Sequence, residues 1–383
     1  MDEIDVEGKS VLLRVDYNIP LNESKVGDNY KLINSIPTIK YLLKNNCKII
    51  IATHLGRPKG KVVNELKTDL LAKELARILK KKVIKLNGAI GEGVIRKVKK
   101  SKNNLFMLEN LRFYKEEKEN DLAFAHGLAD LADVYINDAF AVCHRNHASV
   151  SAITKFLPCF GGLSLKNEIM QLRKALKPVR PAVWIFGGAK LNKLTLIEHA
   201  LQKADNILIG GALVFSFLKA KGIPVGMSKI DTDSVRWARK LLKHKFRNKI
   251  ILANDFLVAE KWSSRAKSEL VENILQQQIG LDLGPKSIDL FKKYLRGAKT
   301  IVWNGPLGYY EWNQFAVSTK AIGRFIGKLT AATICGGGET TEALRKFNLQ
   351  HDITHLSAGG GATLAFLAGD KLPGLSALIN KNK

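Results

Sequence analysis

The chain of 383 residues has little of three things: long apolar runs, clustered cysteines and acidic residues. No run approaches the ~20 apolar residues that span a bilayer, and the acidic start of the chain lacks an apolar stretch, so we expect neither a membrane span nor a secretory signal. The four cysteines, at positions 47, 143, 159 and 335, lie too far apart for a zinc site or a disulfide framework. A reducing cytoplasm is therefore the expected setting.

Basic residues greatly outnumber acidic ones, with 61 Lys and Arg against 35 Asp and Glu and a net charge of +26. Such a balance is typical of proteins that bind nucleic acid or membrane surfaces, but it equally fits small anionic substrates or a lysine-rich proteome. The lysines are scattered and are not interleaved with aromatic residues as in RNA-binding motifs. We do not expect nucleic acid to be the main partner, and the reason for the charge stays open.

Short apolar runs alternate with amphipathic helical patterns, which predicts strand–helix–strand units in parallel sheets. The rhythm breaks once, in residues 165–180, where residues 167–176 form a helical pattern that ends before Pro178. We expect two doubly wound parallel-sheet (Rossmann-like) α/β domains joined by an interdomain helix and a hinge. The expected strands are Val11–Val15, Lys48–Ala52, Val83–Leu86, Asn104–Leu108 and Val134–Asn137, then Ala182–Phe186, Asn206–Ile209, Lys249–Leu252, Thr300–Trp303 and Thr333–Cys335.

Ligands of open α/β sheets bind beyond the carboxyl ends of the strands. In the first half, arginines and histidines follow successive predicted strands, and guanidinium groups fit carboxylates and phosphates. This pattern predicts a site for a small polyanion, although any one of these arginines could be a solvated loop charge. The residues are Asp16, Asn18, His54, Arg57, Arg112, Arg145 and His147.

In the second half, glycines follow the strands, which leaves room for a large flat ligand such as a nucleotide against the backbone. Gly336–Gly338 lie between a predicted strand and helix, where free amides favour phosphate. The turn lacks the Gly-Lys-Ser/Thr of a P-loop, and tight packing of a helix is the alternative interpretation. One half that holds a small anion and one that holds a nucleotide, joined by a helix, predict a hinge kinase.

From end to end the chain resembles the phosphoglycerate kinase family. Several sequence stretches match the family and occur in the same order as in the family, so the resemblance does not depend on any single stretch. They are Leu13–Pro20, Thr53–Pro58, Leu108–Phe113, Asn137–Phe140, His144–Ser149, Gly187–Lys190, Val302–Gly308, Gly336–Thr340 and Gly359–Ala362.

The resemblance implies reversible phosphoryl transfer between MgATP and 3-phosphoglycerate by a cytoplasmic monomer, with Mg²⁺ bound together with ATP or ADP. It implies a 3-phosphoglycerate domain (residues 1–165, completed by a tail at about 364–383), an interdomain helix (166–178) and a nucleotide domain (179–363). The implied substrate-binding residues are Asp16, Asn18, Lys31, His54, Arg57, Arg112 and Arg145. The implied nucleotide-binding residues are Lys193, Gly280, Glu311, Gly337, Gly338, Glu339 and Thr340, with Glu339 also placing the metal. The implied catalytic residues are Lys31, Lys190, Lys193, Gly338 and Gly361.

The chain departs from the family pattern near the implied transfer centre. Lys31 stands where the family has an arginine, so the charge remains but the planar fork is lost. Glu339 stands where the family has an aspartate, and the spacing from Lys190 to Lys193 is one residue short. We therefore weigh an active kinase against a catalytically weakened relative whose basic surface binds RNA, another protein or a membrane.

Overall fold

The computed structural model describes residues 5–22, 25–27, 29–189 and 194–380. The chain divides into two compact units, Met1–Ile169 with Lys371–Lys383 and Met170–Asp370. The division falls inside helix α6 (Leu163–Leu176), and the chain returns to the first unit at Lys371, later than the expected residue 364. Among the described residues, no helix combines the length and apolar character that a membrane crossing requires.

The first unit is built on a six-stranded parallel sheet with the order β5-β6-β4-β1-β7-β8. Its two central strands are almost entirely buried, as expected when helices cover both faces of a parallel sheet. The strands are β1 (Ser10–Arg14), β4 (Lys48–Ala52), β5 (Ile84–Lys85), β6 (Leu105–Met107), β7 (Val134–Asn137) and β8 (Cys159–Gly161).

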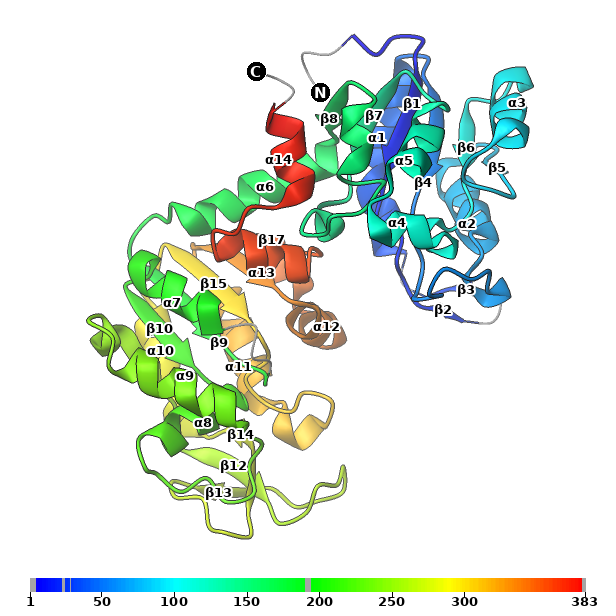
Figure 1. Cartoon of the computed structure of the whole chain (residues 1–383). Coiled ribbons are helices and arrows are strands. Elements are labelled where there is room, and N and C mark those ends of the chain that lie inside the picture. The colour runs from blue at the N-terminus through cyan, green and yellow to red at the C-terminus, as the bar shows by residue number, and fades with distance from the viewer. Residues whose placement is uncertain (1–4, 23–24, 28, 190–193, 381–383) are drawn as a thin grey trace. The chain divides into compact units, whose positions relative to one another are not determined.

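Helices surround this sheet (Figure 1). On α2 the buried side chains are Leu71, Ala72 and Leu75, the helical spacing that places one apolar stripe against a core. They share a cluster with Leu13 and Ile51 of the central strands. The helices of this unit are α1 (Tyr30–Lys44), α2 (Asp69–Leu79), α3 (Glu92–Lys100), α4 (Lys115–Glu119), α5 (Leu122–Ala129) and α14 (Pro373–Asn380).

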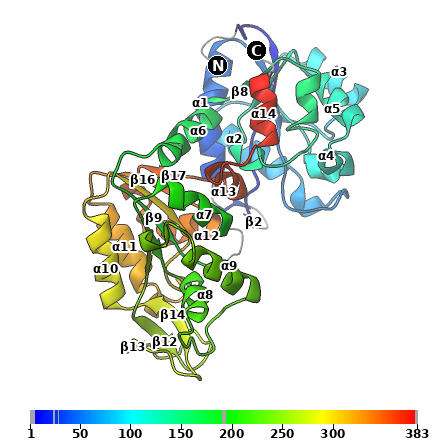
Figure 2. The same cartoon turned by 60° about the vertical axis from the view of Figure 1, so that its left-hand side comes forward.

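The second unit repeats the plan with the strand order β11-β10-β9-β15-β16-β17, again parallel throughout. Helix α9 contacts α7 and α8, and α11 contacts α10 and α12. Figure 2 shows α8 and α9 on one side of the sheet and α10 and α11 on the other. The strands are β9 (Ala182–Phe186), β10 (Asn206–Ile209), β11 (Ile250–Leu252), β15 (Thr300–Asn304), β16 (Ala332–Gly336) and β17 (His355–Leu356). The helices are α7 (Leu194–Lys203), α8 (Leu213–Ala220), α9 (Thr232–Leu242), α10 (Pro285–Leu295), α11 (Val317–Ile326), α12 (Gly338–Lys346) and α13 (Gly361–Leu367). Two parallel-sheet α/β units confirm the predicted fold class.

Two small antiparallel pieces were not predicted. A three-stranded sheet is formed by β12 (Phe256–Ala259), β13 (Glu269–Val271) and β14 (Ile279–Leu283). A two-stranded ribbon pairs β2 (Leu21–Asn22) with β3 (Lys25–Val26). The three-stranded sheet supplies one wall of the pocket described below.

The C-terminal helix α14 belongs to the first unit, where it contacts β8. Gly374 donates its N–H to the carbonyl of Cys143 at 2.9 Å. A side chain at Gly374 would come within 2.7 Å of Val150, so the close approach requires glycine here. The first unit is therefore completed by residues from the far end of the chain.

Candidate active site

In the first unit, polar side chains gather where neighbouring strands of the sheet end. Because the strands are parallel, the segments that follow them meet at one edge of the sheet. Together with Lys31 of α1, these side chains form a group that we call the anion rim. Its other members are Asp16 and Asn18 after β1, His54 and Arg57 after β4, Arg112 after β6 and Arg145 after β7.

Lys31 is held in the anion rim by two contacts. Its Nζ donates to Asp16 Oδ2 at 2.7 Å and to the carbonyl of Asn18 at 3.0 Å. The side chain of Asn18 in turn accepts the N–H of Gly56 at 2.9 Å, which links the ends of β1 and β4. Lys31 thus has one N–H group beyond those two contacts.

His54 is neutral, and its tautomer is fixed by its neighbour. Burial, followed by the charges of Arg14, Arg112 and other cations, holds the pKa of His54 well below its ordinary value. Arg14 Nη2 lies 3.1 Å from His54 Nδ1. Since a guanidinium can only donate, Nδ1 accepts and the proton sits on Nε2. His54 therefore offers an N–H group to an anion without adding a positive charge.

The arginines of the anion rim lower one another's pKa values. Burial and the charges of Arg145 and Arg14 lower the pKa of Arg112 to about 10. Burial likewise lowers the pKa of Arg145, which Arg57 and Arg14 also depress. The Arg112 Nε atom is buried and has no hydrogen-bond partner in the described part of the chain. Holding like charges together costs free energy that a bound polyanion would offset.

Beneath the anion rim lies a buried polar network that our sequence reasoning missed. Arg14 is completely buried; its Nε donates to Ser149 Oγ at 2.9 Å, and its Nη2 lies 3.9 Å from Glu117 Oε1. Glu117, also completely buried, accepts the N–H and O–H of Ser149 at 2.9 and 2.7 Å. Its Oε1 lies 3.7 Å from His147 Nδ1. The available signal was an arginine inside the apolar run Val11–Val15, which a sheet buried on both faces tolerates only with partners.

In the second unit, glycines at the strand ends serve close backbone packing. A Cβ at Gly187 would lie 2.1 Å from the carbonyl oxygen of Pro306, and one at Gly211 would lie 2.4 Å from the backbone N of Gly188. A Cβ at Gly280 would meet Phe215 at 2.3 Å. The prediction that the strand-end glycines leave open space was therefore wrong for Gly187 and Gly211, because neighbouring loops already fill it.

Open space instead forms a pocket of about 280 Å³ beside the strand ends. Trp262 and Tyr309 line it, with ring centroids 4.7 Å apart. Trp312 supports both rings from 5.2 and 4.6 Å. Trp262 is 52% exposed, so it offers an aromatic face to a ligand. The sequence analysis did not single out these aromatic residues, which are scattered along the chain and carry no motif.

Three of the predicted nucleotide residues, Gly280, Glu311 and Glu339, line this pocket. Gly337 and Gly338 form the turn into α12, where Gly337 has a φ of +96°. Apart from neighbours in its own helix, no atom of the described residues lies within 4 Å of a Cβ at Gly338. This turn leaves the first N–H groups of α12 beside the pocket wall made by Glu339.

Other predicted residues have different surroundings. The hydroxyl of Thr340 accepts the N–H of Gly305 at 2.6 Å and donates to the carbonyl of Gly336 at 2.9 Å, so its side chain secures the turn. Gly361 begins α13 and is exposed. Lys190 and Lys193 lie outside the described residues.

A buried acid supports the pocket wall from behind. Asp282 accepts the N–H of Leu283 at 2.8 Å and the O–H of Ser318, and a side chain at Gly308 would come within 2.1 Å of its Oδ1. Burial raises the pKa of Asp282 from 3.8 to about 7. Between pH 3.8 and about pH 7, the carboxyl group of Asp282 therefore keeps a proton in the folded protein that it loses in the unfolded chain.

This linkage predicts a pH effect on stability. The contribution of Asp282 is fully present below pH ~4 and is lost as the pH rises towards ~7, with a slope of at most ~1.4 kcal/mol per pH unit. In Asp282→Asn, the free energy of unfolding should fall less steeply with pH over this range, as measured by urea unfolding at several pH values. The exposed Asp289, changed to Asn, is the control. Parallel curves for the parent and Asp282→Asn would contradict the prediction.

The anion rim of the first unit holds three arginines that form no ion pair with an acid among the described residues, and the second unit holds an aromatic pocket beside a glycine-rich helix start. In class, this is a kinase of two α/β domains that acts on a small anion.

The phosphoglycerate kinase family model matches residues 1–370. The chain is 42% identical to a phosphoglycerate kinase of Pelotomaculum thermopropionicum over 386 residues, covering 99% of this chain and 98% of the relative. It is 42% identical to that of Prochlorococcus marinus, covering 100% and 98%. Among solved structures, phosphoglycerate kinase from Coxiella burnetii aligns with a TM-score of 0.88 at 32% identity, covering 100% of this chain and 99% of that one. The chain belongs to the phosphoglycerate kinase family.

Proposed function

We propose that the chain is an active enzyme that transfers a phosphoryl group reversibly between MgATP and 3-phosphoglycerate. Membership of the phosphoglycerate kinase family supports this reaction. The observation that carries activity in this chain is the anion rim, where three arginines and Lys31 lie together and burial lowers the pKa of two of the arginines. Nothing in the comparisons favours the alternative of a non-catalytic basic binding protein.

In the first unit, the anion rim would hold 3-phosphoglycerate. Arg57, Arg112 and Arg145 supply guanidinium groups for its phosphate and carboxylate. His54 donates Nε2–H, while Asp16 and Asn18 keep Lys31 in place. The acceptor carboxylate is already ionised near pH 7 and is itself the nucleophile, so no general base is needed. The work of the protein is to position the two substrates and to neutralise charge that spreads over the transferring group.

In the second unit, the nucleotide would occupy the aromatic pocket. Its base would lie against Trp262 or Tyr309. Glu311, which lines the same pocket, would accept hydrogen bonds from the ribose hydroxyls. The phosphates extend towards Gly337, Gly338 and the N-terminus of α12, where the helix dipole and free amides favour negative charge.

The residues present fit a magnesium ion that arrives with the nucleotide. No group of three or more potential metal-ligating side chains occurs among the residues that the structure describes. Glu339 is one carboxylate in the pocket wall, and Mg²⁺ commonly takes one or two carboxylates together with substrate phosphates. When bound, the ion would neutralise phosphate charge.

We further propose that Lys190 and Lys193 contact the phosphates and that Gly338 and Gly361 present backbone N–H groups to the transferring group.

The test is a coupled assay with 3-phosphoglycerate and either ATP or GTP, run side by side. We expect turnover with ATP, and quenching of Trp262 fluorescence by ADP that is lost in Trp262→Phe. Absence of turnover with either nucleotide would contradict the proposed activity.

A cytoplasmic setting is supported by four buried free thiols. The monomeric state stays a prediction.

A further inference from the structure

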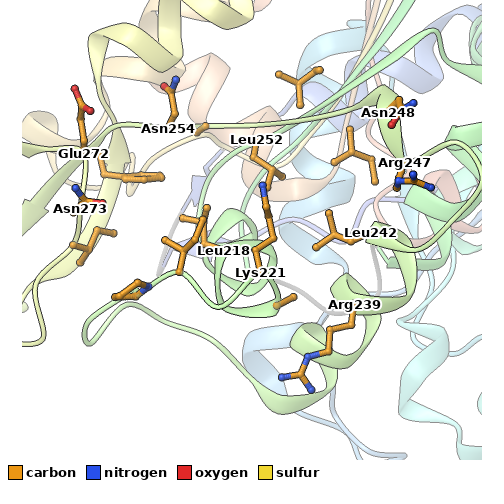
Figure 3. A pocket seen from close by; sticks show the side chains of 18 of the residues that line it. Leu218, Lys221, Arg239, Leu242, Arg247, Asn248, Leu252, Asn254, Glu272 and Asn273 are labelled. Carbon is orange, nitrogen blue, oxygen red and sulfur yellow. The ribbon is translucent and has the colours of Figure 1, made fainter.

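A second cavity, of about 890 Å³, lies in the second unit and shares no lining residue with the aromatic pocket (Figure 3). The whole of strand β11 and the two residues after it, Ile250–Asn254, form one wall. Residues of α8, α9 and the segment after β13 form the others. We call this cavity the edge groove, because β11 is the outermost strand of its sheet.

The strand that lines the edge groove has a backbone edge that is partly free of partners among the described residues. Ala253 donates its N–H to the carbonyl of Ile209 on β10 at 3.3 Å, so residue 253 faces the sheet. Successive residues of a strand turn their N–H and C=O groups to opposite sides. Ile251 therefore also faces β10, whereas Ile250 and Leu252 direct their N–H and C=O groups away from it. The N–H of Ile250 is bonded to the carbonyl of Arg247, so the groups offered to a docking strand are the C=O of Ile250 and both groups of Leu252. This open stretch ends at Asn254, whose N–H is taken by Ser287 Oγ at 2.9 Å.

The floor of the edge groove is apolar. Leu218, Phe256 and Ile274 are 6%, 2% and 2% exposed, and Leu242 and Leu252 are half-buried. Figure 3 shows Leu218, Leu242 and Leu252 facing the same space. Alternate side chains of an extended chain laid along β11 would reach this floor.

The rim of the edge groove is basic. Lys221, Arg239, Lys243 and Arg247 are all exposed, and none forms an ion pair with an acid among the described residues. Glu272 is the acidic residue of the lining, and it is already paired with Lys286. Other cations of α9 differ in this respect, since Arg236 pairs with Asp233 and Lys240 with Glu198. The charge along the groove is therefore uncompensated.

Cations near a free edge are a usual protection against pairing with other strands. Basic side chains beside an edge strand repel basic segments of other proteins, but they attract an extended segment that carries acidic residues. We propose that the edge groove docks an extended acidic segment of a partner protein, which adds a strand to β11. Its backbone bonds to the C=O of Ile250 and to the N–H and C=O of Leu252. Its alternate apolar side chains lie on the floor, and its carboxylates lie along the basic rim.

The probe is a fluorescein-labelled peptide Glu-Val-Glu-Val-Glu, which matches the length of Ile250–Asn254. Its anisotropy is measured with the full chain, beside a Lys-Val-Lys-Val-Lys peptide. We expect the acidic peptide to bind and the basic one to bind at least ~10-fold more weakly, with acidic binding weakened at about 0.3 M salt. Equal binding of the two peptides, or no binding of the acidic peptide, would overturn the proposal.

Two matched pairs of variants test the geometry. Leu252→Pro removes an N–H group on the open side of β11 but no hydrogen bond to β10, and an edge strand tolerates such a proline. Leu252→Ala keeps that N–H group. We expect the proline variant to bind ~10-fold more weakly than the alanine variant, and equal affinities would exclude strand addition. Lys243→Glu with Arg247→Glu should abolish binding. Arg236→Glu, at a position of α9 that does not line the groove, should not. Equal losses would exclude the basic rim. Phosphoryl-transfer turnover checks folding of every variant.

Discussion

Lys31→Ala should lower kcat by ~10³-fold in the coupled assay with ATP and 3-phosphoglycerate. The lysine ammonium lies in the anion rim, 2.7 Å from Asp16, and the variant leaves that carboxylate without its cation partner. A cation that acts mainly on the transferring group stabilises the transition state more than the bound substrate. The loss should therefore fall mostly on kcat, with a smaller rise in the KM for 3-phosphoglycerate.

The Lys31→Arg variant keeps the positive charge of the side chain and changes its shape and its number of N–H groups. Lys31 uses two N–H groups on Asp16 and Asn18, whereas a guanidinium has five and can hold Asp16 while it faces a phosphoryl oxygen. We expect kcat to rise in this variant. An unchanged or lower kcat would mean that the site is built around lysine. Lys40→Ala, an exposed change on the same helix α1, is the control and should leave kcat unaltered.

Glu117→Ala should lower the free energy of unfolding by ~3–5 kcal/mol, because it leaves the buried Arg14 without its acid and Ser149 without its acceptor. Burial raises the pKa of Glu117, so this carboxylate is itself costly to bury, and Arg14 and Ser149 are what stabilise its charged form. Because Arg14 also holds His54, the variant should raise the KM for 3-phosphoglycerate as well.

Urea unfolding of Glu117→Ala, Glu117→Gln and Glu119→Gln measures this effect. The glutamine at 117 keeps one acceptor for Ser149 and should lose less stability than the alanine. Glu119 is exposed on the same helix α4, so its change should stay within ~0.5 kcal/mol of the parent. Similar losses for the Glu117 and Glu119 variants would show that the buried network contributes little.

The parallel sheets were predictable because their strands are short runs of buried apolar residues. β4, β7, β9 and β10 begin and end where the sequence analysis expected. The strand β14 was missed since Gly280 and Asp282 interrupt its apolar pattern, and both are there for local packing and hydrogen bonds.

The anion rim was predictable for a different reason. Its side chains follow strands of one parallel sheet, so the topology alone brings them to one edge. The network beneath it was not, because Arg14, Ser149 and Glu117 meet only through tertiary contacts. The aromatic pocket was also missed, since Trp262 and Tyr309 are far apart in sequence and only the fold places their rings together.

The C-terminal helix α14 has a consequence for synthesis on the ribosome. The first unit includes α14, which is translated only after the entire second unit has been translated. The domain that emerges first therefore waits, short of its last helix, while a whole second domain is made and folds. During that interval Cys143 and Val150 lack the cover that α14 provides, so the nascent first unit is the stage of the protein's life most in need of a chaperone.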